Sequence, residues 1–150
     1  MKIRFRHILP ILILIVACSK DKFTTEPQIN VKSISPGTVS TGNIISLSSN
    51  FTDDEGDVDS VLIVNKWYAG ETPTYIDTFR YSISGLGLPA KTRKGEMTVQ
   101  FEYNSNNSGG AYIPIFGAGT DTTATLGLVL IDAAKHRSNY SESAKVRLLK

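Results

Sequence analysis

Cysteine and histidine are nearly absent from this sequence, and neither sign of charge is in large excess. The single cysteine excludes an intrachain disulfide. Only one of the two histidines, His136, lies beyond the first seventeen residues, which excludes a zinc site built from several imidazoles. The 16 basic and 14 acidic residues nearly cancel, which excludes a strongly basic nucleic-acid-binding protein and an acidic solvating tail. Hydrophobic residues make up 41% of the 150-residue chain, enough for one packed core.

Sequence patterns that carry catalysis are also missing. There is no nucleophile-elbow motif, and the glycine-rich stretch 85–89 lacks the Lys-Ser/Thr pair of a phosphate-binding loop. The acidic residues crowd into one turn, whereas the two carboxylates of a glycosidase face each other across a cleft. We therefore predict that the protein is not an enzyme, with a Ser–His pair around His136 as the weaker alternative.

The first seventeen residues have the pattern of an export signal. Lys2, Arg4 and Arg6 precede an apolar run over residues 8–16, and Ala17 follows it. This run is shorter than the roughly 20 apolar residues that a transmembrane helix needs. A charged start, a short apolar run and a small residue before the cleavage point are typical of a secretory signal peptide.

The residues around the single cysteine refine this interpretation. The segment Leu14-Ile15-Val16-Ala17-Cys18 resembles the lipobox of bacterial lipoproteins. The resemblance implies cleavage before Cys18, lipidation of its thiol and of the new N-terminus, and attachment to the outer membrane. Several acyl chains give stable anchoring. An ordinary secretory signal followed by an unrelated cysteine is the alternative.

The four residues after the cysteine bear on which side of the outer membrane the domain faces. Ser19-Lys20-Asp21-Lys22 resembles the surface-export signal of Bacteroidetes-type lipoproteins, although that signal usually has two adjacent acidic residues. The resemblance implies a location at the cell surface, and a plain polar tether is the alternative. The mature chain would carry one net negative charge, because three of the 16 basic residues lie in the signal peptide.

Beyond a linker over residues 18–28, the sequence has the composition of a β domain. Val, Ile, Thr, Tyr and Phe dominate from Ile29 onward, with Gly, Pro, Asn and Asp at short intervals. We predict one all-β domain over residues 29–150, an immunoglobulin-like antiparallel β-sandwich of about seven strands, with an up-and-down barrel as the alternative. The expected strands are 29–35, 43–51, 58–68, 74–84, 96–103, 123–132 and 143–149.

Two segments carry a resemblance that supports this fold. Residues 129–135, the polar loop after them and the last alternating strand resemble the final hairpin of immunoglobulin-like and fibronectin type III-like domains. Residues 51–58 (Phe-Thr-Asp-Asp-Glu-Gly-Asp-Val) resemble the link between the second and third strands of similar domains in Bacteroidetes-type lipoproteins. These motifs are short, and they imply the fold without implying a ligand.

An acidic segment near residue 55 is a candidate metal site. Asp53, Glu55, Asp57 and Asp59 alternate along the chain and would point the same way in an extended loop. Ca²⁺ takes six to eight oxygen ligands and suits such a loop, although the spacing departs from that of an EF-hand. The favoured alternative is a solvated turn in which Asp and Gly supply the backbone geometry.

Aromatic residues supply the candidate ligand-binding positions. We expect Trp67 to be a core residue, and we expect Tyr68 and Tyr75 to be exposed and able to stack on sugar rings. The 18-residue stretch 104–121 contains Tyr112 and Phe116, which either anchor a ligand or cap the open end of the sandwich. Pro114 confines the middle of this stretch to an edge strand or an extended crossing.

These features favour a lipid-anchored outer-membrane or cell-surface binding or accessory module. Its loops would contact a glycan, a peptide or an outer-membrane protein complex, because loops on a rigid sheet scaffold commonly carry recognition. A structural envelope lipoprotein without a small ligand is the alternative. The two hypotheses differ in whether Tyr75→Ala or Tyr112→Ala weakens a ligand or only destabilises the domain.

Overall fold

The computed structural model describes residues 25–86, 89, 91–117 and 119–150. The predicted signal peptide, Cys18 and most of the predicted linker lie outside the described residues. None of the helical turns in the described part of the chain is long and apolar enough to cross a membrane. The elements are β1 (Gln28–Ser35), β2 (Thr38–Val39), β3 (Ile44–Thr52), β4 (Val58–Ala69), β5 (Thr72–Ser82), η1 (Ser84–Leu86), β6 (Lys94–Tyr103), β7 (Ile113–Ile115), β8 (Thr122–Asp132), β9 (Ser141–Glu142) and β10 (Val146–Leu148).

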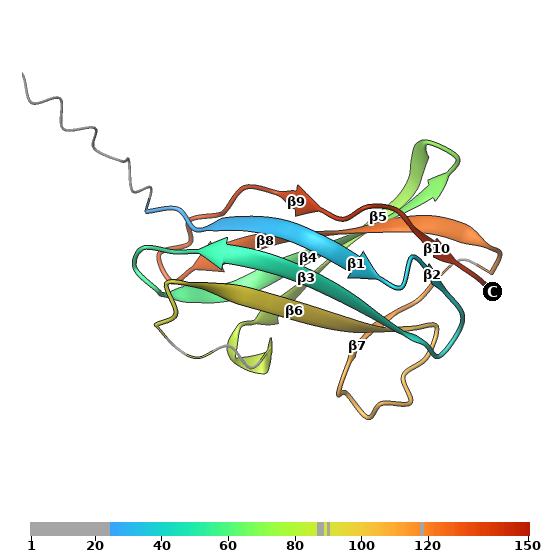
Figure 1. The fold of residues 1–150 in the computed structure, drawn as a ribbon, viewed down its shortest axis with the longest axis horizontal. Coiled ribbons are helices and arrows are strands. Elements are labelled where there is room, and N and C mark those ends of the chain that lie inside the picture. Colours follow the sequence, from blue (N-terminus) through green and yellow to red (C-terminus); the bar gives the residue numbers. More distant parts are fainter. Residues whose placement is uncertain (1–24, 87–88, 90, 118) are drawn as a thin grey trace, which may run out of the picture.

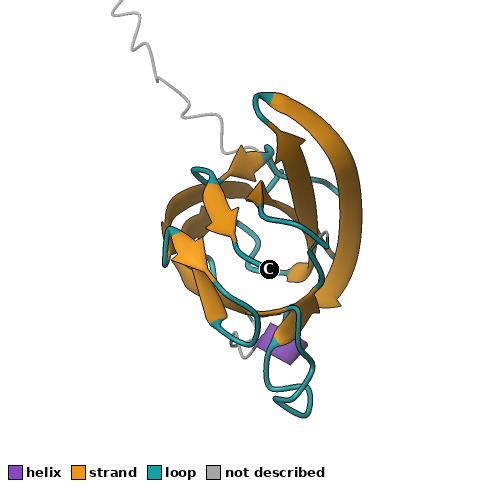
Figure 2. Cartoon of the chain, turned by 90° about the vertical axis from the view of Figure 1, so that its right-hand side faces the viewer, coloured by secondary structure: helices purple, strands orange, loops and turns teal. Residues whose placement is uncertain are grey.

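The strands form two sheets that pack face to face (Figure 1, Figure 2). One sheet has the order β1-β3-β6-β7, and the other has the order β2-β10-β8-β4-β5, with β9 beside β8. The strands β1, β3 and β6 thus lie in the sheet opposite β4, β8 and β10, as in immunoglobulin-like sandwiches, and β5 extends the second sheet beside β4. The predicted all-β sandwich is therefore confirmed.

The structure departs from the expected antiparallel pattern at two short strands. β2 runs parallel to β10, and β7 runs parallel to β6, so both sheets are mixed. The strands β2, β7 and β9 have only two or three residues each, too few to show an alternation of apolar and polar side chains. Pro114 lies in the edge strand β7, as expected, because an edge strand tolerates the missing N–H.

The core consists of the side chains that the period-two patterns placed on one face. β3 and most of β6 bury alternate residues, whereas β8 buries residues on both of its faces. The central strand β4 is apolar on both faces. Each large side chain that is fully buried contributes roughly 1.5–3 kcal/mol to folding. The largest of these are Tyr103, Phe101, Ile45, Leu47, Ile63, Met97, Ile115, Leu126, Leu128 and Leu130.

The two ends of the sandwich are distinct. At the first end, called the tether end here, β1 begins beside the β3–β4 turn over residues 53–57, and Val58 pairs with Asp132. At the opposite end, called the distal end, lie the β4–β5 hairpin around Gly70, the residues after β7, and the start of β8 (Figure 1). The hairpin projects beyond the rest of the sandwich.

Candidate functional site

Asp53 is a structural residue of the β3–β4 turn. Its side chain is 2% exposed, and its Oδ2 accepts the backbone N–H groups of Asp57 and Val58 at 2.7 and 3.1 Å. Gly56 lies between them with a φ of 67°, a left-handed conformation that glycine adopts without a steric penalty. The carboxylate of Asp53 therefore points into the turn and holds its shape.

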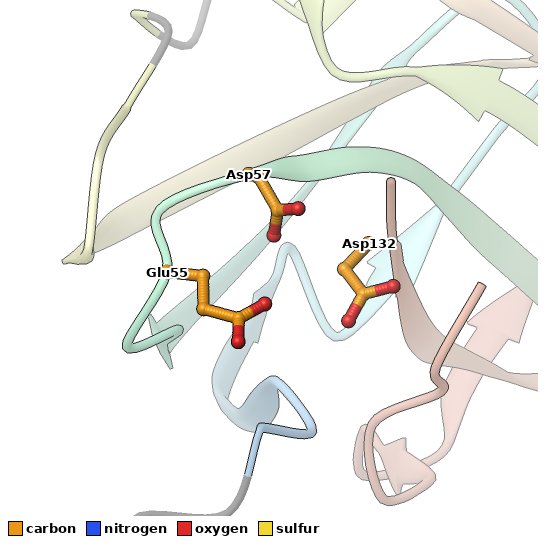
Figure 3. Close-up of side chains that lie close together, drawn as sticks. All are labelled: Glu55, Asp57 and Asp132. Atoms are coloured by element: carbon orange, nitrogen blue, oxygen red, sulfur yellow. The ribbon is translucent and has the colours of Figure 1, made fainter. Parts of the chain in front are cut away.

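Three other carboxylates converge at the tether end. The side chains of Glu55, Asp57 and Asp132 each offer an oxygen, and these oxygens lie within 4.8 Å of one another (Figure 3). Glu55 and Asp57 come from the β3–β4 turn, and Asp132 is the last residue of β8. Of the four acidic residues predicted to form one site, only Glu55 and Asp57 come together. The third carboxylate of the group, Asp132, lies more than 70 residues later in the sequence.

Asp132 is the buried member of this group. Its side chain is fully buried, its Oδ1 accepts the backbone N–H of His136, and its Oδ2 lies 2.8 Å from Nδ1 of the same residue. The hydrogen bond and the charge of Asp132 raise the pKa of His136. No hydroxyl group hydrogen-bonds to the His136 ring among the described residues, so the alternative of a Ser–His pair gains no support.

Asp59 does not share the site that was predicted for it. Its side chain lies 3.2 Å from Lys135 Nζ and 3.1 Å from an Arg80 guanidinium nitrogen. Hydrogen bonding and attraction to Lys135 lower the pKa of Asp59. The alternation that was expected to align Asp53, Glu55, Asp57 and Asp59 fails because Asp53 and Gly56 form a turn there and the segment is not extended.

The three converging carboxylates fit a hard cation in part. Carboxylate oxygens are the ligands that Ca²⁺ prefers, and Asp57 Oδ1 is buried without a hydrogen-bond partner. Three carboxylates fall short of the six to eight ligands that Ca²⁺ takes, and both oxygens of Asp132 already bond to His136. The calcium site stays a prediction, now with Glu55, Asp57 and Asp132 as its ligands.

An aromatic pair lies near the distal end. Trp67 of β4 and Tyr75 of β5 are directly paired across the strands, and their ring centroids are 4.8 Å apart. Trp67 is half-buried and packs against the core, in partial agreement with the expectation that it is a core residue. Tyr75 is 47% exposed, and its hydroxyl donates to Asp77. This pair is called the distal aromatic pair below.

Tyr68 belongs to a different face of the sheet. A bulge separates it from Trp67, and its hydroxyl lies within hydrogen-bond distance of Thr125 and Glu142. Glu142 also forms an ion pair with Lys66, at 3.1 Å, and the Nζ of Lys145 lies 4.7 Å from the Tyr68 ring. Tyr68 is thus half-buried in a polar network and, contrary to expectation, is not an exposed stacking residue.

The two aromatic residues of the 104–121 segment have different environments. Phe116 is 58% exposed at the distal end, immediately after β7. Tyr112 is half-buried and lines a groove on the side of the sandwich with Tyr81 and Gln100. Glu102 stabilises the loop that connects β6 to β7, because its carboxylate accepts the backbone N–H groups of Asn107 and Ser108.

Three residues with functional geometry escaped the sequence analysis. Asp132 ends a buried strand without any acidic neighbour in the sequence, so no local pattern connects it to the β3–β4 turn. Tyr81 lines the same groove as Tyr112, whereas the alternating pattern of its strand indicated only which face it lies on. Ile76 is 58% exposed on the projecting hairpin, where the preceding residues 72–75 are exposed as well.

Comparisons with known proteins give the chain no family. No family model matches it, and no curated protein matches it. Similar solved structures include the alkylpurine DNA glycosylase AlkC from Pseudomonas fluorescens bound to DNA, at 12% identity and a TM-score of 0.47. A Niemann-Pick type C2 protein from the Japanese carpenter ant has 14% identity and a TM-score of 0.43. The sporulation control protein Spo0M from Bacillus subtilis has 6% identity and a TM-score of 0.39.

Each of these structures aligns with most of this chain, namely 84% for the glycosylase, 82% for the Niemann-Pick protein and 83% for Spo0M. The aligned region makes up 31% of the glycosylase chain, 89% of the Niemann-Pick protein and 50% of Spo0M. The chain thus spans about a third of the length of the glycosylase. At these TM-scores the likenesses carry no argument about function.

Proposed function

We propose that this chain is a lipid-anchored binding module of the outer membrane. The lipid on Cys18 would hold it to the membrane, and the distal aromatic pair would contact a glycan. The observation that supports a binding surface is Tyr75, which is 47% exposed while its ring contacts the half-buried Trp67 at an interplanar angle of 37°. A buried partner fixes the orientation of the exposed ring, so less side-chain entropy is lost when a ligand stacks on it.

The position of the pair in the fold suits such a module. The chain enters the sandwich at the tether end, whereas the β4–β5 hairpin projects at the distal end (Figure 1). A binding surface on this hairpin therefore lies away from the end at which the chain enters the sandwich (Figure 1). Thr74 and Asp77 flank Tyr75 and offer the hydrogen-bonding groups that a sugar ring requires.

An outer-membrane protein is the second candidate ligand, and it is favoured by one observation. Ile76 is 58% exposed next to Tyr75, and because successive strand residues point to opposite faces, the projecting hairpin is apolar on both faces. Sugar rings need a single aromatic face, whereas a protein surface could cover both faces of the hairpin.

Affinity electrophoresis of the detergent-solubilised full chain against a panel of soluble polysaccharides tests the glycan. We expect retardation by at least one polysaccharide, and Tyr75→Ala should weaken it by about tenfold, the effect of losing a central aromatic anchor. Tyr140→Ala is the matched control, because Tyr140 is 41% exposed and lies over Gly127, away from the pair. Equal loss in both variants, or no retardation by any polysaccharide, would contradict glycan binding.

Metabolic labelling with a radioactive fatty acid tests the anchor. We expect the wild-type chain to incorporate label and to sediment with the outer membrane. Cys18→Ala should lose both properties, since the thiol is the acceptor of the diacylglyceryl group. Ser19→Ala is the matched control and should retain both. Unlabelled wild-type protein in the soluble fraction would show that the segment is an ordinary secretory signal.

A further inference from the structure

The two edges of the sheet that contains β1 and β6 differ in how their backbone hydrogen-bonding groups are satisfied. On the side of β1, side chains from the segment around β9 occupy the edge of the strand. Asn139 accepts the N–H of Ile29 at 2.9 Å and donates to its carbonyl oxygen at 2.8 Å, and Ser141 accepts the N–H of Val31 at 2.8 Å. This edge therefore presents few free backbone groups to another strand.

On the opposite side, most of β6 has an unpaired edge. β7 pairs only with the last three residues of β6, which leaves the stretch 94–100 without a neighbouring strand on that side. The N–H and C=O groups of Tyr103 bond to Asn43 and Gly42 at the start of β3. Because backbone groups alternate in direction along an antiparallel strand, those of Glu96, Thr98 and Gln100 point away from β3, toward the open side.

A groove of about 380 Å³ lies at this unpaired edge. Thr98 and Gln100 of β6 form one wall, and Tyr81 and Leu86, from β5 and η1 of the other sheet, form the opposite wall. Residues 110–114 close its end, at the start of β7. Figure 2 shows η1 and the loop before β7 on this same side of the sandwich. The groove thus combines free backbone hydrogen-bonding groups with half-buried aromatic and aliphatic side chains.

Three of the four charged residues near the start of this edge are positive, and the fourth is Glu96. Lys91, Arg93 and Lys94 are exposed at the start of β6, and none of them forms an ion pair among the described residues. The basic residues on the strands of the other sheet, Lys66, Arg80 and Arg147, are each paired with an acidic side chain. A ligand that follows this edge of β6 therefore meets an excess of positive charge at one end.

We propose that this groove binds an extended, acidic peptide segment of a partner protein. The segment would add to β6 as a further strand, end to end with β7, and bond to the backbone of Glu96, Thr98 and Gln100. Main-chain hydrogen bonds supply affinity in such strand addition, and side-chain pockets supply specificity. Tyr81 and Tyr112 would contact its apolar side chains, and Lys91, Arg93 and Lys94 its acidic residues. This surface is separate from the distal aromatic pair.

The full chain, expressed in its own cells with a photo-crosslinking amino acid at Gln100, tests the proposal. We expect an adduct whose crosslinked peptide, mapped by mass spectrometry, comes from another protein and contains acidic residues. Thr98→Pro should lower the yield of the adduct by about tenfold, because proline removes the N–H that faces the groove. The β3–β6 ladder does not use this N–H, so an edge strand tolerates the change.

Two further variants control this experiment. Thr98→Ala keeps the N–H and should give the wild-type yield of adduct. The double variant Arg93→Glu, Lys94→Glu changes only exposed side chains, and should lose the adduct through charge repulsion even if Thr98→Pro does not fold. An adduct with a second copy of this chain, an adduct with a glycan, a yield that both Thr98→Pro and the charge reversal leave unchanged, or no adduct at all would overturn the proposal.

Discussion

Replacement of Asp53 tests whether this carboxylate is structural or a metal ligand. Its Oδ2 accepts two backbone N–H groups inside the β3–β4 turn while the side chain is 2% exposed. Each hydrogen bond to a charged group contributes about 1.5–3 kcal/mol. The loss is reduced because Asp53→Ala also removes a buried oxygen, Oδ1, that has no partner, and because water can reach the turn. We therefore expect Asp53→Ala to lower the free energy of unfolding by about 2–4 kcal/mol.

Asp53→Asn should fall between the wild type and Asp53→Ala. The amide oxygen can take the position of Oδ2 and accept the same two N–H groups, but the bonds lose their charge assistance. We expect a decrease of about 1–2 kcal/mol for this variant. Asp54→Ala is the matched control, because Asp54 is exposed, and its effect should lie within about 0.5 kcal/mol.

Urea-induced unfolding of the full chain in detergent micelles measures these differences. The single tryptophan, Trp67, reports unfolding through its fluorescence and lies near the distal end, far from the substitution. The experiment is done with a chelator present. If Asp53→Ala is as stable as the wild type in chelator and less stable only with calcium, Asp53 is a metal ligand and the structural argument is wrong. An equal loss in Asp54→Ala would contradict it as well.

Two more predictions concern the tether end. The pKa of His136 is raised by Asp132, so this pair stabilises the fold fully below the unfolded pKa of about 6.5 and loses its contribution as the pH rises through the folded pKa. The difference in Tm between the wild type and His136→Gln, measured in chelator, should therefore be largest near pH 5 and shrink toward pH 8; a difference that grows with pH would refute this. Millimolar Ca²⁺ should raise the Tm by mass action if Glu55, Asp57 and Asp132 bind the ion, and Asp57→Asn should remove the shift whereas Asp59→Asn should retain it. No shift in the wild type would exclude the site.

Most of the fold followed from local patterns. Alternation of apolar and polar residues predicted the six long strands to within two residues at each end, and the apolar faces it indicated on β3, β6 and β8 are buried. The seventh predicted strand, 143–149, is wrong in extent, because only β10 (Val146–Leu148) forms there. Pro114 was correctly confined to an edge strand. The short strands β2, β7 and β9 could not be predicted, because two or three residues show no period and their pairing depends on what lies beside them.

The candidate sites depended much more on the tertiary structure. The sequence by itself determined that acidic residues gather between two strands and that aromatic residues flank a hairpin, because both properties are local. Only the tertiary structure decided that Asp53 turns inward, that Asp132 joins Glu55 and Asp57, and that Tyr68 and Tyr75 lie on opposite faces. The physical reason is that a side chain's direction depends on turns, bulges and partners from distant strands. The register of β4 with β8, for example, brings Asp132 beside Val58.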